Sequence, residues 1–404
     1  MSEIAAVRGY TASQCWSADG WQADAVLGVD AHGRLVEPPD AVVEALGAWV
    51  LPGMPNLHSH AFQRAMAGLA ERRGGSEDSF WSWRETMYAF AAAIGPDALR
   101  AIAAQLYVEM LKAGYTQVCE FHYLHHQPDG TPYARPEAMS LALIEAAHEA
   151  GIELTLLPVL YMSGGFDGRA LSARQRRFGH DVDGYLRLLQ ALLEHEIAER
   201  EARRIDRHRA ESQLGADKRL ASFDFAAVPS VSKAQVMALT EATEWLDRGA
   251  NVLLFGPPGV GKTHLIAGIG HALIDAGRRV LFTRCSELVQ RLQAARRDLR
   301  RPVELVKLDR FDLLILDDLS YVRRDQAETS VLFELIAERY ERRSLAITAN
   351  TPFSQWSEVF VEPAMTLAAI DRLVHHSTIL EMNVESYRRR AAQQGHAPAA
   401  RTQR

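Results

Sequence analysis

The sequence contains few cysteines, few lysines and no long apolar run. Three cysteines among 404 residues, Cys15, Cys119 and Cys285, lie far apart, which excludes a disulfide framework and a CxxC metal site. No stretch of about 18 apolar residues occurs, so no transmembrane helix is expected. The N-terminus lacks a basic region followed by an apolar segment, so we predict no signal peptide, a cytoplasmic location and no membrane partner.

The overall charge hides a difference between two halves of the chain. The formal net charge is −6, and 48% of the residues are hydrophobic, which excludes global disorder. Residues 1–195 carry 14 basic and 23 acidic side chains, whereas residues 196–404 carry 31 and 28. Net charges of −9 and +3 indicate two units with different partners.

Hydrophobic patterning divides the chain into segments of different character. Three β/α repeats in the first half predict a parallel sheet, too few for a complete (β/α)₈ barrel. A highly charged helical stretch follows, which fits either a solvated helix or a nucleic-acid or partner surface. The predicted segments are a small β region at 1–50, the partial barrel at 51–192, a charged helical connector at 193–222, an α/β domain at 223–391 and a disordered tail at 392–404.

In the second half, five apolar strands alternate with helices, which predicts a doubly wound parallel sheet. The expected strands are residues 251–255, 280–283, 312–317, 345–349 and 378–382. The expected helices are residues 262–275, 286–298, 327–341 and 364–374.

A phosphate-binding motif connects the first of these strands to the first helix. Its pattern is GxxxxGK[ST], in which backbone N–H groups and a helix N-terminus surround phosphates. Lys262 is expected to neutralise the β and γ phosphates of ATP, and the Thr263 hydroxyl to ligate Mg²⁺. The motif with the residue after it consists of Gly256, Pro257, Pro258, Gly259, Val260, Gly261, Lys262, Thr263 and His264.

Polar residues at later strand and helix ends complete a candidate ATPase site. Asp317 fits the acid that holds Mg²⁺, and Asp318 the acid that deprotonates water, unless both only cap a turn. Asn350 either positions the water or belongs to turn chemistry. Arg372 is either an arginine finger acting on a neighbouring subunit or a surface residue.

These residues carry a family resemblance. The second half resembles the IstB-type helper ATPases of insertion sequences, which are AAA+ proteins similar to the helicase loader DnaC. The resemblance implies ATP-dependent self-assembly on double-stranded DNA, recruitment of a transposase, and the roles given above for Asn350 and Arg372. Its motifs are residues 223–225, 256–264, 311–321, 332–341, 368–373 and 386–389.

The first half contains a metal-type motif, His58-Ser59-His60. Imidazoles at i and i+2 share one face of a strand and can bind one metal ion, although most HxH pairs are surface or core histidines. With residues 80–85 and 120–123, the motif resembles formimidoylglutamate deiminase, an amidohydrolase that uses Zn²⁺. The resemblance implies metal binding by His58 and His60 and a substrate pocket lined by Gln63, Arg84 and Tyr123.

The barrel and its metal site are incomplete in the sequence. A (β/α)₈ barrel needs eight strands and a catalytic zinc needs three protein ligands, but the chain offers three strands and two ligands before the ATPase begins. We therefore expect a vestigial site that does not retain Zn²⁺, an exposed inner sheet face, and His122, His125 and His126 as loop residues near the former pocket. Two other functions stay open, an active Zn-dependent deiminase and a nucleotide-binding recruiter with little turnover.

Overall fold

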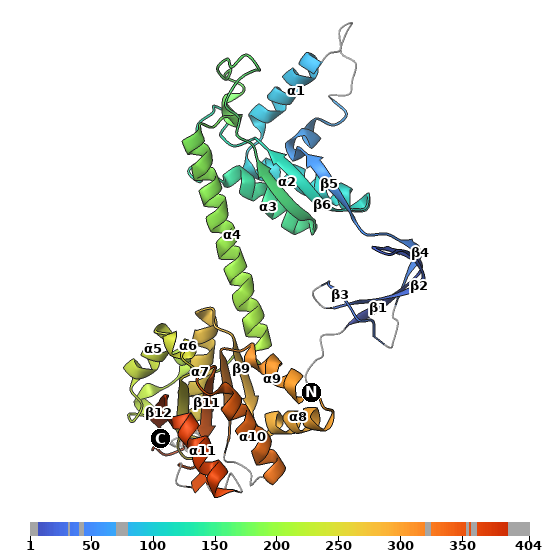
Figure 1. The fold of residues 1–404 in the computed structure, drawn as a ribbon. Helices are drawn as coiled ribbons and strands as arrows, with labels where there is room; N and C mark the ends of the chain where they lie inside the picture. Colours follow the sequence, from blue (N-terminus) through green and yellow to red (C-terminus); the bar gives the residue numbers. More distant parts are fainter. Residues whose placement is uncertain are drawn as a thin grey trace, which may run out of the picture. The chain divides into compact units, whose positions relative to one another are not determined.

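The computed structural model contains two compact units, residues 1–195 and 196–404 (Figure 1). In the described residues, no helix is both long and apolar enough to span a membrane. The predicted tail 392–404 and the motif residues 320–321 and 387–389 lie outside the described residues. The structure describes residues 7–30, 33–39, 44–69, 80–319, 325–352, 355–356 and 362–386.

A small sheet opens the first unit. The strands β1 (Arg8–Ser17) and β2 (Gly20–Val29) form an antiparallel hairpin, β3 (Leu35–Val36) pairs with β2, and β4 (Glu44–Val50) runs parallel to β1. Three indoles meet edge to face on this sheet, with ring centroids 5.2 Å apart for Trp16 and Trp21 and 5.1 Å for Trp21 and Trp49.

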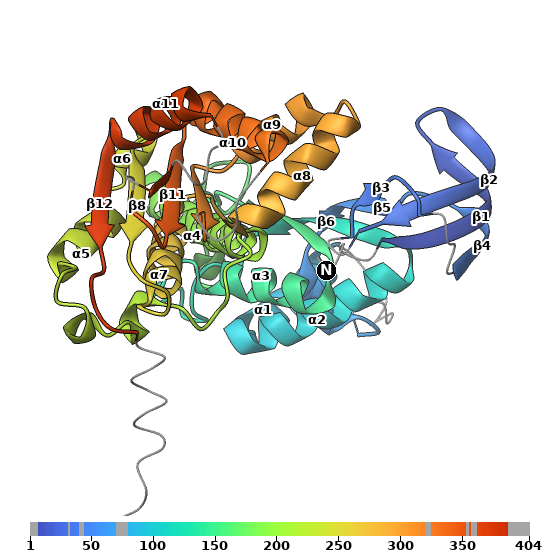
Figure 2. The same ribbon diagram turned by 90° about the horizontal axis from the view of Figure 1, so that it is seen from below.

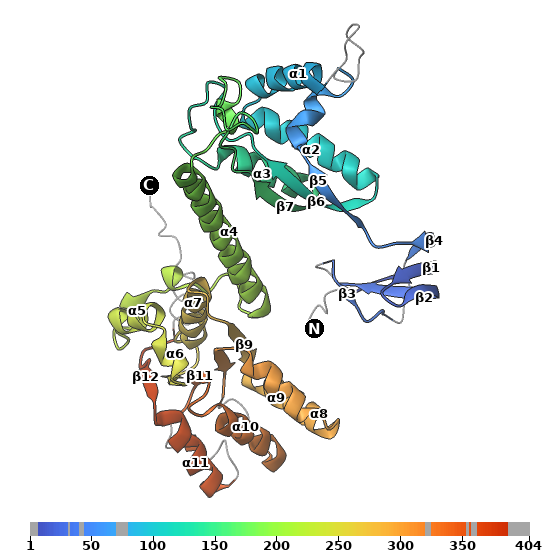
Figure 3. The same cartoon turned by 45° about the horizontal axis from the view of Figure 1, so that its top comes forward.

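The rest of the first unit contains the predicted β/α units. β5 (Met54–Ser59), β6 (Tyr115–His122) and β7 (Glu153–Pro158) form a parallel sheet in that order. The core of the unit joins this sheet to α2 and α3, which lie together on it (Figure 3). Leu57 on β5 is 69% exposed, as expected for a barrel wall without its interior. The helices are η1 (Ala61–Met66), α1 (Phe80–Ala93), α2 (Pro96–Lys112), α3 (Ala138–Ala150) and η2 (Arg176–Phe178).

The charged connector is largely one helix, α4 (Val182–Glu211). It begins eleven residues before the predicted connector and ends within it. Ion pairs one turn apart run along its surface, Arg200 with Glu196 and Arg204 with Glu201, and such pairs stabilise a solvated helix by about 0.2–0.5 kcal/mol each.

The second unit contains the predicted parallel sheet, in the strand order β12-β8-β11-β10-β9. Every predicted strand is present within one residue of its expected ends, and the doubly wound α/β fold is confirmed. The strands are β8 (Asn251–Phe255), β9 (Val280–Arg284), β10 (Leu313–Asp317), β11 (Ser344–Ala349) and β12 (Ser377–Glu381).

Helices cover both faces of this sheet (Figure 2). One core contains α8, α10 and α11, and the other contains α5, α6 and α7. The helices α5, α6 and α9 were not expected from the sequence. The helices are α5 (Lys233–Glu241), α6 (Glu244–Asp247), α7 (Lys262–Asp275), α8 (Cys285–Arg297), α9 (Arg301–Asp309), α10 (Gln326–Arg339) and α11 (Pro363–Val374), after the short turns η3 (Leu220–Ser222) and η4 (Phe225–Ala227).

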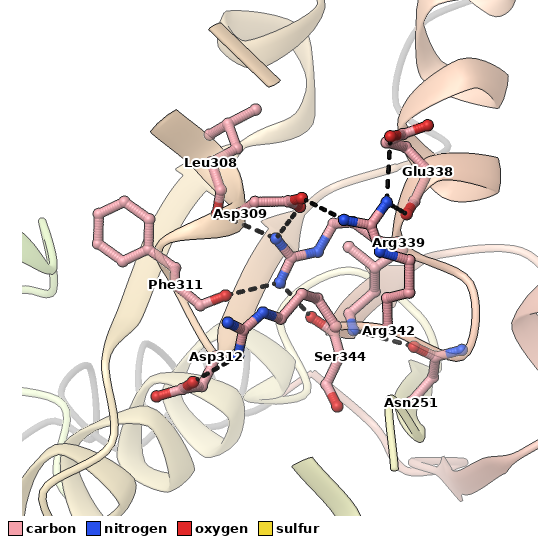
Figure 4. A network of polar contacts seen from close by, with 11 residues as sticks. Asn251, Leu308, Asp309, Phe311, Asp312, Glu338, Arg339, Arg342 and Ser344 are labelled. Atoms are coloured by element: carbon pink, nitrogen blue, oxygen red, sulfur yellow. Dashed lines mark hydrogen bonds and ion pairs between the residues drawn. The ribbon is translucent and has the colours of Figure 1, made fainter. Parts of the chain in front are cut away.

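A buried arginine ties α9, α10 and β11 together at the amino end of the sheet (Figure 4). Arg339 is 1% exposed and donates hydrogen bonds to the carbonyl oxygens of Leu308, Phe311 and Ser344 at 2.9–3.0 Å. Burial lowers the pKa of Arg339 to about 10, although Asp309 at 3.8 Å favours its charge. The guanidinium thus satisfies carbonyl groups at the end of α9 and at the start of β11.

Candidate functional site

The phosphate-binding loop joins the buried strand β8 to α7, as the motif predicts. Gly256 has φ +152°, and a Cβ there would stand 2.5 Å from the Met382 carbonyl oxygen. Gly261 begins α7 with φ +103°, a left-handed conformation that favours glycine. Because the first N–H groups of a helix have no intrahelical partner, this loop and helix end suit an anion.

Lys262 lies at the centre of the site with all three ammonium hydrogens in use. Its Nζ donates to the carbonyl oxygens of Gly256 at 2.6 Å and Pro257 at 2.9 Å, and to Asn350 Oδ1 at 2.7 Å. Burial lowers the pKa of Lys262, an effect that Asp318 and Asp317 oppose. The lysine therefore connects the loop to the end of β11.

Thr263 and Asp317 form the part of the site that fits a hard cation. The Thr263 hydroxyl lies 3.0 Å from both carboxylate oxygens of Asp317, which is buried at the end of β10. Magnesium prefers such oxygen ligands and keeps several waters. The sequence predicted this pair, and the fold brings the two side chains together.

Thr348 holds both acidic residues, and its role was not predicted. Its hydroxyl donates to Asp317 Oδ1 at 2.7 Å and accepts the backbone N–H of Asp318 at 2.9 Å. Asp318 has φ +58°, a conformation that costs a non-glycine residue about 1 kcal/mol or more. Thr348 thus fixes the turn that presents Asp318. The sequence signal is a hydroxyl near the end of the largely apolar strand β11.

His264 holds residues 219–223 beside the phosphate-binding loop. Its Nε2 lies 3.1 Å from both the Arg219 carbonyl oxygen and the Ser222 hydroxyl. The ring of Phe223 meets His264 edge to face at 5.5 Å and lies 3.3 Å from the position of a Cβ on Gly261. The motif at 223–225 therefore contacts the phosphate loop, a position that the sequence did not reveal.

Arg372 does not join these residues within the chain. It lies in the last turn of α11, where Nη1 donates to the Ala368 carbonyl oxygen at 2.9 Å and the guanidinium lies 5.3 Å from the Phe333 ring centre. A role on a neighbouring subunit stays a prediction.

In the first unit, the two predicted metal ligands converge. His58 Nε2 and His60 Nε2 lie 3.1 Å apart, and His60 Nδ1 lies 2.8 Å from the Phe121 carbonyl oxygen. Burial lowers the pKa of His60, so a neutral ring that donates from Nδ1 directs its lone pair from Nε2 toward His58. Across the ranges that the structure describes, no third His, Cys, Asp or Glu ligand atom lies within 4.8 Å of both.

Two of the three predicted pocket residues lie beside this pair. Gln63 donates to the Tyr123 hydroxyl at 2.9 Å, and the Tyr123 ring lies 5.1 Å from His60. Arg84 instead donates from Nε to the Tyr88 hydroxyl at 2.7 Å. Burial raises the pKa of Glu120, which accepts the Ala61 N–H, to about 7.

The prediction that three further histidines are loop residues needs correction for one of them. His122 belongs to β6 and is buried, whereas His125 and His126 follow the strand. The His125 ring packs 5.0 Å from His122 and 4.7 Å from His180. Burial lowers the pKa of His122 well below its usual range and that of His125 to about 3. These rings form a neutral core cluster.

Comparison with known proteins gives two families for the two parts of the chain. Residues 168–395 match the IstB-like ATP binding proteins, and residues 49–253 match the amidohydrolase family. An insertion sequence ATP-binding protein of Sinorhizobium fredii is 67% identical over 51% of this chain and 69% of that protein. The IS21 ATP-binding protein of Pseudomonas aeruginosa is 34% identical over 60% of this chain and 89% of that protein.

The N-terminal match covers a smaller share of its relative. Formimidoylglutamate deiminase of Pseudomonas aeruginosa is 56% identical over 43% of this chain, which spans 39% of the enzyme's length. Among solved structures, an amidohydrolase from Brucella melitensis is 30% identical with a TM-score of 0.42, over 93% of this chain and 70% of that one. The DnaC helicase loader is 20% identical with a TM-score of 0.33, over 41% and 97%.

Both resemblances expected from the motifs are confirmed. The chain belongs to the IstB-like ATP-binding proteins, and it also carries an amidohydrolase-family region similar to formimidoylglutamate deiminase.

Proposed function

We propose that the second unit binds and hydrolyses ATP with Mg²⁺ as a helper protein for transposition. The observation that carries the proposal is the convergence of Lys262, Thr263, Asp317 and Asn350 through hydrogen bonds of 2.7–3.0 Å. Phosphoryl transfer needs little from a protein beyond such positioning and charge.

Each side chain has a role that follows from its place. The Lys262 ammonium would exchange its carbonyl acceptors for phosphate oxygens of a bound nucleotide. Thr263 and Asp317 would hold Mg²⁺, which would neutralise phosphate charge. Asp318, held by Thr348, accepts a proton from the attacking water, and Asn350 orients that water. Arg372 stabilises transition-state charge on a neighbouring subunit's nucleotide.

The association with DNA and a transposase rests on family and charge. Insertion sequence proteins of the IstB type are the relatives, and residues 196–404 carry a net charge of +3. We propose that the protein assembles on double-stranded DNA and recruits a transposase. Phosphate contacts release counterions, so the affinity for DNA falls as salt rises.

We propose that the amidohydrolase region has no deiminase activity. His58 and His60 supply two ligands where a catalytic zinc requires three and a water, and the chain spans 39% of the deiminase. Ammonia release from formimidoylglutamate with one equivalent of zinc would contradict this.

The decisive experiment compares ATP hydrolysis by the full chain and by Lys262→Ala, with Mg²⁺ and with double-stranded DNA. Loss of the ammonium is expected to lower turnover at least about 100-fold, because a buried charge at the phosphates is lost. Lys307→Ala, which changes a 57% exposed lysine on α9, is the matched control and keeps full turnover. Equal turnover in Lys262→Ala and in the unchanged protein would contradict the ATPase proposal. An affinity for DNA that does not change with salt concentration would contradict the DNA-binding proposal.

A further inference from the structure

Two turns at the amino end of the second sheet carry a cluster unrelated to the nucleotide site. Glu341 lies in the turn between α10 and β11, and His375 and His376 lie in the turn between α11 and β12. Because the strands are parallel and the phosphate loop follows the carboxyl end of β8, this cluster lies at the opposite ends of the strands from the nucleotide site. We propose that Glu341, His375 and His376 bind one Zn²⁺ ion.

The separations of the ligand atoms fit one metal ion. His375 Nδ1 and His376 Nε2 each lie 3.5 Å from Glu341 Oε1, and one ligand atom of each side chain lies within 4.8 Å of the others. Zinc bonds of about 2.0–2.2 Å in tetrahedral geometry separate ligand atoms by about 3.3 Å. Small side-chain rotations are therefore enough to form the site.

The same atom of His375 has a second neighbour. The Tyr340 hydroxyl lies 2.7 Å from His375 Nδ1, and the two rings stack with their centres 5.9 Å apart. A hydroxyl that donates there occupies the lone pair of Nδ1. Zinc binding at Nδ1 therefore has to displace the Tyr340 hydrogen from that lone pair.

Buried polar residues hold both turns in place (Figure 4). Arg339, two residues before Glu341, donates to the Ser344 carbonyl oxygen at the start of β11. Asn251 accepts the Leu345 N–H at 2.9 Å and donates to the Leu373 carbonyl oxygen at 3.1 Å, so it joins β11 to the end of α11. The ligands thus come from backbone segments that share one scaffold.

Gly249 packs directly against the backbone of Glu341. Glu341 has φ +56°, which is unusual for a non-glycine residue. A Cβ on Gly249 would stand 2.7 Å from the Glu341 carbonyl carbon, so the two chain segments touch. Because the Glu341 backbone is already held in place, metal binding has to order fewer groups, which lowers its entropic cost.

The ligand set selects the class of metal. Imidazole nitrogens suit zinc and other late first-row ions, whereas magnesium and calcium prefer oxygen ligands alone. All three side chains are exposed, which leaves coordination positions for water. Zinc there links the turn after α10 to the turn after α11 and stabilises the second unit. The site is independent of the proposed ATPase function.

The test measures binding of Zn²⁺ alone to the tag-free full chain by competition with a chromophoric chelator. The background carries His58→Asn and His60→Asn, so that the pair in the first unit does not contribute. We expect one equivalent of zinc, and at least tenfold weaker binding after His376→Gln or Glu341→Gln. His148→Gln, which changes an exposed histidine on α3, keeps the affinity of the background.

Hydrogen exchange locates the bound ion. Zinc is expected to slow exchange in residues 340–343 and 374–377 of the background protein, and not in the His376→Gln variant. Absence of zinc binding in the background, or binding and protection that survive both His376→Gln and Glu341→Gln, would overturn the proposal. Glu341→Gln keeps the shape of an exposed side chain, so its loss of binding is not a loss of folding.

Discussion

Lys262 donates a hydrogen bond from Nζ to Asn350 Oδ1 across 2.7 Å, and this contact joins the phosphate loop to the end of β11. Two residues 88 positions apart are thereby held in one site. Asn350→Ala is expected to lower ATP turnover about 10- to 100-fold while ATP affinity changes less, since the amide acts on the attacking water. Steady-state hydrolysis and equilibrium nucleotide binding separate the two effects.

The control for this variant is Asn383→Ala, which removes an exposed asparagine whose side-chain amide donates to Glu381 Oε2 at 3.4 Å. It should leave turnover unchanged. Equal losses of binding and turnover in Asn350→Ala would contradict a role confined to the water.

Thr348→Val should weaken the response of the ATPase to magnesium. The valine has the same shape but loses the hydrogen bonds to the Asp317 carboxylate and the Asp318 N–H. Losing these two hydrogen bonds costs about 1–3 kcal/mol, so the magnesium concentration for half-maximal hydrolysis rises. Thr348→Ser restores the hydroxyl and should rescue it. An unchanged magnesium dependence in Thr348→Val would refute this positioning role.

Asp318→Asn distinguishes an ATPase from a nucleotide-dependent recruiter. The substitution removes the base while the backbone N–H of residue 318 still reaches Thr348. Turnover is expected to fall at least about 100-fold with ATP affinity retained. If DNA binding and transposase capture with ATP also stay intact, hydrolysis is dispensable for recruitment. Unchanged turnover would exclude Asp318 as the base.

Acidification is expected to destabilise the first unit. Burial lowers the pKa of His125 to about 3, that of His180 to about 4 and that of His122 well below its usual range. The unfolded chain therefore takes up more protons below about pH 6.5, and stability is lost as pH falls from there toward about 4. Glu120, with its pKa raised to about 7, opposes this, because its contribution is present at low pH and lost as pH rises through about 7. The three histidines together lower the stability at acidic pH by more than Glu120 raises it.

Pulse proteolysis in urea checks this at about pH 7 and about pH 5. His125→Phe removes one proton-binding group and should reduce the dependence by about 1.4 kcal/mol per pH unit. The exposed His148→Phe is the control. Equal urea midpoints at both pH values would show that the cluster does not govern the stability of this unit.

Arg339→Met should destabilise the second unit by about 3–5 kcal/mol, because three buried hydrogen bonds to a charged group are lost. Arg342→Met changes a 58% exposed arginine that pairs with Asp309 and should cost no more than about 0.5 kcal/mol. Urea unfolding of the two variants gives the comparison. Similar costs would contradict a structural role for the buried guanidinium.

Local sequence signals predicted most of the second unit. The strands β8 and β10 are continuous apolar runs, so their ends could be placed, and the phosphate motif identified Lys262 and Thr263. The helix α9 was missed because it is short, highly charged and separated from α8 by Leu299, which has φ +57°. Its nine residues do not stand out from a loop by length.

Contacts that depend on strand order could not be predicted. Thr348 contacts Asp317 because β11 lies beside β10, and Glu341 meets His376 because β12, β8 and β11 are neighbours. In the sequence these residues are 31 and 35 positions apart. His58 and His60 were paired correctly because their spacing of two residues is itself the geometric signal.

The three indoles of the small N-terminal sheet have an optical consequence. The Trp21 ring lies 5.2 Å from Trp16 and 5.1 Å from Trp49, with interplanar angles of 72° and 86°. We therefore expect their electronic transitions to couple and to give a paired positive and negative band in circular dichroism. The coupling exists only while β1, β2 and β4 stay together. The sheet thus contains its own spectroscopic label, and its assembly can be followed in the intact chain without adding a dye.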